Sequence, residues 1–251
     1  MAILVFEHSD STNAERLAIT LRDFGQRLRI VQLQHGDDVP PDLDDVDGLI
    51  SCGGPQSAYD DSIEWLEPQM NLMRQAHAIG MPIVGLCLGS QILARALGGK
   101  VEKMPASGGG IEFGWHEVKL SPVGREDPLH FGIAWESMQF HHHRDQVSQL
   151  PPGAKLLASS DKCKNQTWLL GLRSYGFQYH PELTIETIER WMREEPEALQ
   201  EAGVTVEQVR QQNAKYFAGF ERLTQRLFEQ IALFLMPVDR RYQGLVKDLH
   251  H

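Results

Sequence analysis

One cysteine lies where an apolar segment passes directly into a helical pattern. Cys87 stands between Gly85 and Gly89 in the segment 81–91, which reads MPIVGLCLGSQ. Glycines allow the backbone angles and the close approach that a sharp turn from strand to helix requires. A thiol on this turn would meet the unpaired N–H groups and the dipole of the helix start, which favour the thiolate. A buried thiol is often just a small hydrophobe, but this pattern predicts a nucleophile at Cys87.

A second segment supplies the groups that a cysteine nucleophile needs. Residues 175–182 read YGFQYHPE. Side chains two apart in a strand share a face, so His180 and, if the strand continues, Glu182 would point to the same side. A nucleophile needs a neighbouring base, and the base needs a third group that holds its tautomer. We therefore expect Cys87, His180 and Glu182 to act together.

These two segments, with Gly53-Gly54-Pro55 upstream, resemble the class I glutamine amidotransferases. That family has a Cys-His-Glu triad, with the cysteine in a Gly-x-Cys-x-Gly-x-Gln elbow and the other two residues in a His-Pro-Glu motif. The resemblance covers roughly the first three quarters of the chain and is greatest to the amidotransferase half of GMP synthetase and its free-standing relatives. It implies an oxyanion hole formed by the N–H groups of Gly54 and Leu88, and a substrate-holding role for Gln91.

A further stretch matches the family with one departure. The relatives commonly have Ser/Trp-His-Gly-Asp, whose backbone touches the amino-acid end of glutamine, and the matching run here is His142-His143-Arg144-Asp145. The resemblance implies that His142, Arg144 and Asp145 belong to the substrate site. Arg144 replaces a glycine, so it either changes the shape of the pocket or adds a cation for a carboxylate-bearing substrate.

Three consecutive histidines also raise the question of a metal site. Neighbouring side chains of a strand point to opposite faces, so at most His141 and His143 could share an ion. The sequence has neither a Cys-x-x-Cys nor a His-Glu-x-x-His motif, and no carboxylate cluster lies nearby in the chain. We therefore expect no metal site, and the half-reaction implied by the resemblance needs no cofactor.

Composition limits the class of protein. The 251 residues carry a net charge of -10, which opposes binding to nucleic acid. The chain has three cysteines, too few for a paired disulfide framework, and a working thiolate suits a reducing compartment. Neither a secretory signal nor an apolar stretch of about 18 residues is apparent. We expect a cytoplasmic enzyme that binds neither membranes nor nucleic acid.

The hydrophobic patterns predict an α/β fold. Strand and helix patterns alternate from residue 3 to residue 86, which favours an open, mostly parallel sheet with helices on both faces. Residues 100–170 read as antiparallel strands that extend the sheet or cover its edge. We divide the chain into an amidotransferase-like domain, 1–182, and a C-terminal helical extension, 183–251, packed on the same domain. Within the extension, residues 194–197 read as a solvated break between helices.

The predicted activity is attack of Cys87 on the γ-amide of glutamine, which forms a γ-glutamyl thioester and releases ammonia and then glutamate. Three alternatives remain open. The ammonia could pass to a separate synthetase chain, or the enzyme could hydrolyse γ-glutamyl conjugates without transferring ammonia. A regulatory module that has lost catalysis is the third, and the intact set of Cys87, His180 and Glu182 counts against it. Cys52, next to Gly53, should lie near the pocket without taking part in the chemistry.

Overall fold

A computed structural model describes residues 1–106 and 109–238 of the chain. Its centre is a nine-stranded sheet in the order β2-β1-β3-β4-β11-β10-β9-β6-β7. One half is parallel and consists of β1 (Ala2–Glu7), β2 (Leu28–Gln32), β3 (Val46–Ser51), β4 (Ile83–Leu86) and β11 (Ser174–Phe177). The other half is antiparallel and consists of β10 (Thr167–Leu170), β9 (Lys155–Ser159), β6 (Glu112–Leu120) and β7 (Glu136–His143). The predicted parallel sheet with an antiparallel extension is confirmed.

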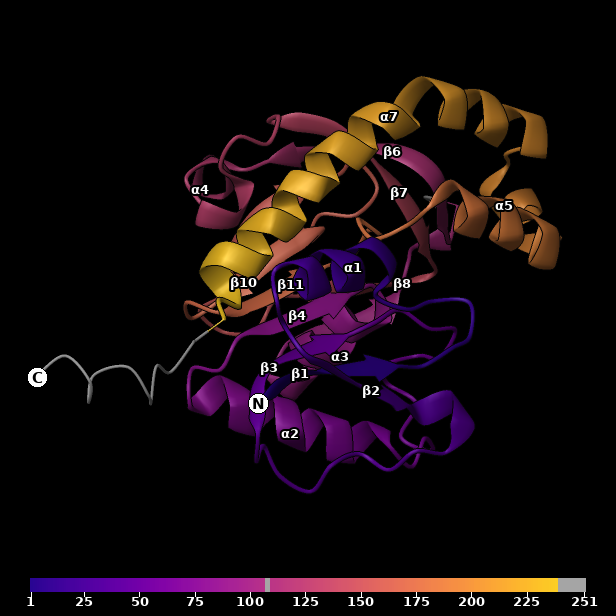
Figure 1. The fold of residues 1–251 in the computed structure, drawn as a ribbon. Coiled ribbons are helices and arrows are strands. Elements are labelled where there is room, and N and C mark those ends of the chain that lie inside the picture. Colours follow the sequence, from indigo (N-terminus) through magenta and orange to yellow (C-terminus); the bar gives the residue numbers. More distant parts are fainter. Residues whose placement is uncertain (107–108, 239–251) are drawn as a thin grey trace, which may run out of the picture.

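Helices cover both faces of the parallel half, as predicted. Helices α1 (Glu15–Asp23) and α7 (Val206–Gln230) lie on one face, and α2 (Leu66–Ala78) and α3 (Leu88–Ala96) lie on the other (Figure 1). Strand alternation explains the two layers. In β1, for example, Ile3 and Val5 belong to one hydrophobic cluster, whereas Leu4 and Phe6 belong to the cluster on the opposite face.

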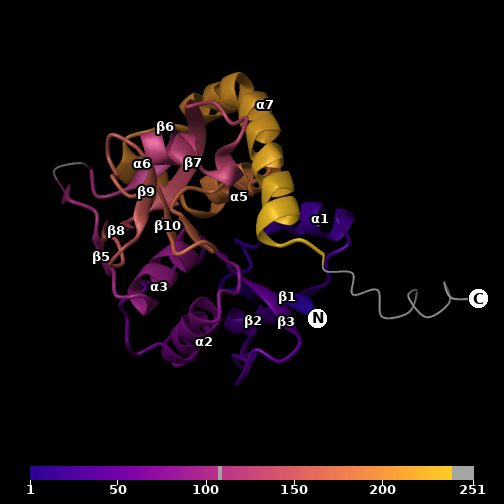
Figure 2. The same cartoon turned by 90° about the vertical axis from the view of Figure 1, so that its left-hand side faces the viewer.

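The C-terminal helices also cover the antiparallel half. After β11 come α5 (Ile185–Glu194), α6 (Pro196–Ala202), α7 and a π-helical turn, Ile231–Leu235. Figure 2 shows α5, α6 and α7 grouped around β6 and β7, where a third hydrophobic cluster includes Phe113, Phe140, Trp191 and Phe220. The start of α7 has a capping box, formed by Thr205 and Gln208.

The remaining elements are small. Strands β5 (Lys100–Lys103) and β8 (Asp145–Gln149) form a separate two-stranded sheet. Short helical turns occur at Leu33–His35, at α4 (Pro122–Arg125) and at Pro128–His130. In the described part of the chain, no helix has the length and apolar character needed to span a membrane.

One expectation about the strand ends needs correction. Strand β11 stops at Phe177, so His180 and Glu182 lie in the turn that follows rather than on the strand itself. Pro181 has no N–H to give to a ladder, and the N–H of His180 instead donates to the carbonyl of Phe140 at 3.0 Å. The two side chains are therefore positioned by a turn that is fixed to β7.

The approach of α3 to β3 suggests a stability test. A β-carbon on Gly89 would lie 1.9 Å from the backbone oxygen of Ser51, so Gly89→Ala must displace backbone. We expect it to destabilise the fold by about 1–3 kcal/mol or more. Gly219→Ala is the matched control because a β-carbon there meets nothing within 4 Å, and removing a helix-interior glycine should stabilise by about 0.5–1 kcal/mol. Urea unfolding of both variants checks the prediction, and a Gly89→Ala protein as stable as the wild type would contradict it.

Candidate active site

Cys87 lies on a strained turn between β4 and α3. Its φ of 49° and ψ of -107° are unusual for a residue with a side chain, and it is the N-cap of α3. Neighbouring strands hold this conformation. The N–H of Cys87 donates to the carbonyl of Phe177 at 2.7 Å, and the N–H of Gly89 donates to the carbonyl of Cys52 at 3.1 Å. The elbow predicted from the sequence is therefore present, with the thiol at the start of a helix.

The turn after β11 brings His180 and Glu182 to this thiol. His180 Nδ1 lies 2.7 Å from Glu182 Oε1, and both side chains are buried. His180 and Cys87 also line the same cavity. The sulfur lies 3.6 Å from the carbonyl oxygen of His142 and 3.8 Å from Nε2 of Gln178. The structure thus brings together the three side chains that the sequence predicted to act together.

Charges determine the protonation of His180. Burial on its own would lower the pKa of this imidazole, but the carboxylate of Glu182 and the thiolate of Cys87 outweigh burial and raise the pKa well above its usual value. The imidazole therefore favours its protonated form between two anionic groups. An imidazolium next to a thiolate is the resting state expected of an activated cysteine.

Two backbone N–H groups lie where an oxyanion could bind. Leu88 is the first residue of α3, and its N–H belongs to the helix start, which has no partner inside the helix. In the described residues, neither this N–H nor that of Gly54 makes a hydrogen bond to the protein. Position 54 requires glycine, because a β-carbon there would lie 2.8 Å from Cβ of His8. Both residues line the cavity next to Cys87, as the resemblance implied.

The cavity over the thiol has a volume of about 280 Å³. This volume lies just below the usual range for ligand pockets, about 300–1,000 Å³. Its wall carries charges of both signs: Lys103, Arg144, Asp145 and Glu195 all line it. The cavity therefore suits a small zwitterionic molecule.

The predicted substrate-binding residues line the cavity, and their side chains already make hydrogen bonds or ion pairs within the protein. Gln91 donates through Nε2 to the carbonyl of Asp145 at 2.9 Å and to Oε1 of Gln178 at 3.2 Å. The carboxylate of Asp145 accepts from the hydroxyls of Ser57 at 2.8 Å and Tyr59 at 3.1 Å. These contacts tie β8 to α3 and to the loop after β3, so they shape the pocket wall in the form the structure shows.

His142 and Arg144 are paired with glutamates from the helical extension. His142 Nε2 lies 3.2 Å from Glu195 Oε2, and Arg144 Nε donates to Glu201 Oε2 at 2.8 Å. Glu195 is the residue between α5 and α6. The expected break between helices is present, but the expectation that it is only solvated was wrong, because Glu195 lines the cavity.

Sequence reasoning missed the contribution of α5. The ring of Trp191 packs edge-on against His180, at 5.0 Å between centroids, and against His142, at 4.9 Å. Its indole N–H donates to the carbonyl of Ser11 at 3.2 Å. Trp191 follows the helical spacing of a core residue, and no local signal distinguishes a core tryptophan from one that supports a catalytic histidine.

The two other cysteines are buried. Burial raises the pKa of the Cys52 thiol well above its usual value and that of Cys163 to about 12. Both thiols therefore stay protonated and unreactive near neutral pH. Cys52 lies next to the pocket loop in sequence, as expected, but it does not line the cavity.

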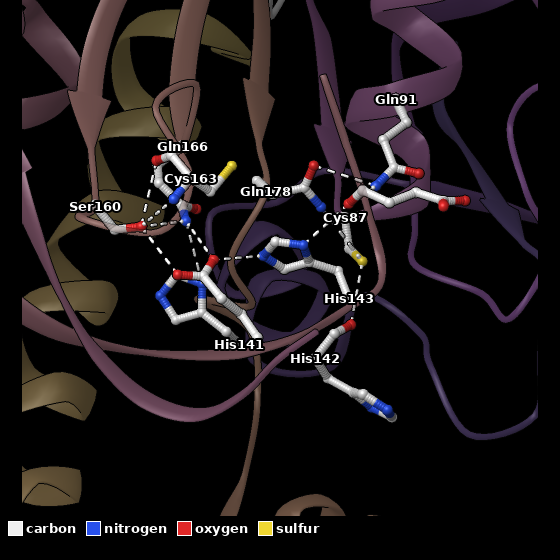
Figure 3. A network of polar contacts seen from close by, with 11 residues as sticks. Cys87, Gln91, His141, His142, His143, Ser160, Cys163, Gln166 and Gln178 are labelled. Atoms are coloured by element: carbon white, nitrogen blue, oxygen red, sulfur yellow. Dashed lines mark hydrogen bonds and ion pairs between the residues drawn. The ribbon is translucent and has the colours of Figure 1, made fainter. Parts of the chain in front are cut away.

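The run of histidines has a partner that the sequence did not reveal. His141 and His143 do share a face of β7, and Glu112, from the adjacent strand β6, lies beside both. No carboxylate cluster was expected near these histidines in the chain, and the fold brings one carboxylate, that of Glu112, to both of them. Figure 3 shows His143 between two groups of polar side chains, with His141, Ser160 and Gln166 on one side and Cys87, Gln91 and Gln178 on the other.

Comparisons with known proteins agree with this geometry. The family model described as Glutamine amidotransferase class-I matches residues 5–195. The glutamine amidotransferase-like protein YfeJ of Salmonella typhimurium is 31% identical over 190 residues, which are 72% of this chain and 75% of that protein. A subunit of the glutamine-hydrolysing GMP synthase of Archaeoglobus fulgidus is 36% identical over 166 residues, which are 65% of this chain and 80% of that protein.

A solved structure shows the same similarity in three dimensions. The crystal structure of a glutamine amido transferase from Methylobacillus flagellatus superposes with a TM-score of 0.82 at 26% identity, and the match covers 91% of this chain and 93% of that chain. The chain belongs to the class I glutamine amidotransferase family and is an enzyme of that family.

Proposed function

We propose that the enzyme hydrolyses the γ-amide of glutamine through a γ-glutamyl thioester on Cys87. The observation that carries this proposal is the placement of Cys87 on the strained elbow, beside the buried pair of His180 and Glu182, in one cavity. The thiolate attacks the amide carbon, and the C–N bond breaks as the imidazolium of His180 gives its proton to the leaving ammonia. Water, deprotonated by the same imidazole, then attacks the thioester and releases glutamate.

The same site supplies groups for the charge that develops on the amide oxygen. The N–H groups of Gly54 and Leu88 would donate to the tetrahedral oxyanion, and removing one such donor typically costs about 10²–10³-fold in rate. Glu182 holds the imidazole in the tautomer that presents Nε2 to the thiol, because Nδ1 faces its carboxylate at 2.7 Å. No metal or nucleotide is required for this half-reaction.

The amino-acid end of glutamine fits the charged wall of the cavity. A carboxylate would be attracted by Lys103 and Arg144, and an ammonium group by Asp145 and Glu195, all of which line the cavity. We propose that Gln91, His142, Arg144 and Asp145 form the substrate-binding wall, with Gln91 acting through its hydrogen bond to the carbonyl of Asp145.

We propose that the C-terminal extension predicted for residues 183–251 is functionally part of the amidotransferase-like domain 1–182 and that its described part, residues 183–238, packs on that domain; residues 239–251 lie outside the described residues. Trp191 contacts the ring of His180, and Glu195 lines the cavity, so the extension completes the pocket. We further propose that the ammonia acceptor is a synthetase on a separate chain. The relatives that are named as one subunit of a glutamine-hydrolysing GMP synthase support this proposal. The half-reaction would take place in the cytoplasm, where thiols stay reduced.

Measuring glutamate release distinguishes glutamine hydrolysis coupled to a synthetase from hydrolysis of γ-glutamyl compounds. We expect wild-type protein to release glutamate from glutamine, faster when the acceptor synthetase is present. Turnover of γ-glutamyl peptides in preference to glutamine would replace the proposal by the γ-glutamyl hydrolase alternative. Inactivity towards both substrates, with and without candidate partner chains, would refute the proposed activity.

The first prediction concerns the nucleophile. Cys87→Ser should lower glutamine turnover by about 10³-fold or more and leave the fold intact, because the oxygen of serine is far less acidic than sulfur. An alkylating glutamine analogue should label Cys87 alone, as read by peptide mass spectrometry. Cys52→Ala and Cys163→Ala are matched controls because both thiols are buried and stay protonated. Full activity in Cys87→Ser, or labelling at Cys52 or Cys163, would show that Cys87 is not the nucleophile.

The second prediction treats His180 and Glu182 as one device. His180→Ala should cost about 10³-fold or more in kcat, and Glu182→Gln should cost less because it leaves the base in place. The double variant should lose little beyond His180→Ala, because the carboxylate acts through the imidazole. Steady-state kinetics of the three variants measure the coupling, and independent, multiplying losses would show that Glu182 acts by another route.

The third prediction follows from the raised pKa of His180. A group whose folded-state pKa exceeds its unfolded value of about 6.5 contributes stability that is fully present below that value and is lost as pH rises through the folded-state pKa. The free energy of unfolding lost in His180→Gln should therefore be greatest near pH 6 and shrink as pH rises through the raised folded-state pKa. Urea titrations of both proteins across this range test it, and a loss that grows with pH would contradict the protonated pair.

A further inference from the structure

Three buried side chains of β6 and β7 face one point behind the active site. Glu112 and His143 are direct cross-strand neighbours, and His141 lies two residues before His143 on the same face. Glu112 and His141 are fully buried, and His143 is 5% exposed. Glu112 Oε2 lies 2.9 Å from His143 Nε2 and 3.4 Å from His141 Nδ1, and one ligand atom from each residue lies within 4.8 Å of the other two.

One ring nitrogen of His143, Nε2, is buried and has no hydrogen-bond partner among the described residues. The other ring nitrogen, Nδ1, lies 3.0 Å from the carbonyl oxygen of Asp145, which only accepts, so Nδ1 carries a proton. When the ring is neutral, Nε2 therefore carries a lone pair, which faces the lone pairs of the Glu112 carboxylate. Nε2 makes no hydrogen bond, because its contact with Glu112 lacks the alignment of an N–H···O bond. A hydrogen bond between His143 Nε2 and Glu112 Oε2 would require that alignment. A metal ion does not, because it binds a lone pair of each atom from a position beside the line that joins the two atoms.

His141 and Gln166 complete the surroundings. His141 Nδ1 lies 3.4 Å from both Glu112 Oε2 and Gln166 Nε2, too far for a strong hydrogen bond. The Gln166 amide nitrogen donates to Glu112 Oε2 at 2.8 Å and to Ser160 Oγ at 3.0 Å, while its oxygen is buried without a partner. Turning this amide by 180° would place the oxygen among the other lone pairs, where it could serve as a fourth ligand.

We propose that Glu112, His141 and His143 bind one zinc ion. Two imidazoles and a carboxylate are a usual protein ligand set for Zn²⁺, and bonds of about 2.0–2.2 Å in a tetrahedron separate the ligand atoms by about 3.3–3.5 Å. The contacts of 2.9 and 3.4 Å need only small adjustments to reach this geometry. Metal-binding histidines usually donate their other ring N–H to a carboxylate, a carbonyl or water, which orients the ring, and Nδ1 of His143 lies 3.0 Å from the carbonyl oxygen of Asp145.

The ion would act on structure rather than on chemistry. It would join β6 to β7, and Gln166 would link it to the segment that enters β10 (Figure 3). Through His143 it would also fix the carbonyl of Asp145, which accepts from Gln91 as well. Because all three ligands are buried, the ion would enter during folding.

Refolding with and without zinc tests the proposal. Full-length protein is denatured with a chelator, refolded with Zn²⁺ or with the chelator present, and gel-filtered. After refolding with zinc, we expect elemental mass spectrometry of the protein to find about one zinc per chain. At zinc concentrations about a hundredfold above Kd, the zinc-refolded protein should melt about 5–10 °C higher than the metal-free protein. X-ray absorption should show only nitrogen and oxygen ligands, at about 2.0–2.2 Å.

Matched variants locate the ion. Glu112→Gln and His143→Gln should lose the zinc and its effect on melting. His130→Gln is the matched control and should keep the zinc and its effect on the melting temperature. His130 is also buried and lies 3.6 Å from the carboxylate of Asp127, but it is not part of the cluster of Glu112, His141 and His143. Cys87→Ser should keep the zinc too, as should a variant with His250→Ala and His251→Ala, which removes the terminal histidines.

Two results would overturn the proposal. Wild-type protein that refolds fully without taking up zinc, and melts at the same temperature with or without it, would leave an imidazolium–carboxylate pair as the content of the cluster. Zinc with a sulfur ligand at about 2.3 Å, lost in Cys87→Ser, would place the ion at the active-site thiol instead. These wild-type measurements decide the question even if the Glu112 and His143 variants fail to fold.

Discussion

The active site depends on how closely α3 approaches β3. Gly89 lies so near the carbonyl of Ser51 that no side chain fits between them, and its N–H is bonded to the carbonyl of Cys52. Because of this contact, the chain must pass from β4 to α3 within a single residue. Cys87 is that residue, and its positive φ is the strained conformation that results. The same sharp turn places Cys87 and Leu88 on the wall of one cavity. The proposed nucleophile and oxyanion donor are therefore positioned by backbone packing rather than by their own side chains.

Features encoded locally were predictable from the sequence, and contacts between distant segments were not. The parallel strands, the elbow at Cys87 and the capping box of α7 follow from short patterns of apolar residues, glycines and cap residues. The pairing of Glu112 with His143 follows from the register of two antiparallel strands, which no local pattern near either residue shows. Glu195 reaches the cavity because α5 packs across the sheet end, a result of tertiary packing.

The turn after β11 illustrates why a pattern can place the right residues for a partly wrong reason. Alternation along residues 175–182 put His180 and Glu182 on one face, and their side chains do meet. The strand ends earlier, however, and the two residues are held by a backbone bond to Phe140 and by the ring of Trp191. Sequence spacing predicted the pair, while its orientation towards Cys87 comes from β7 and α5.

Strand β7 connects the two halves of the site. The backbone carbonyl of His142 lies 3.6 Å from the thiol of Cys87, and the side chain of the next residue, His143, belongs to the buried polar cluster with Glu112. The carbonyl of Asp145, next along the chain, accepts from both His143 and Gln91, so it links that cluster to α3. The turn after β4 therefore carries the proposed nucleophile, while the proposed substrate-binding wall is built from the end of β7, the separate sheet of β5 and β8, and the helical extension. Because the wall and the turn belong to different elements, the proposal implies that a substitution in the wall can alter which γ-glutamyl compound fits without moving the strained turn that carries Cys87.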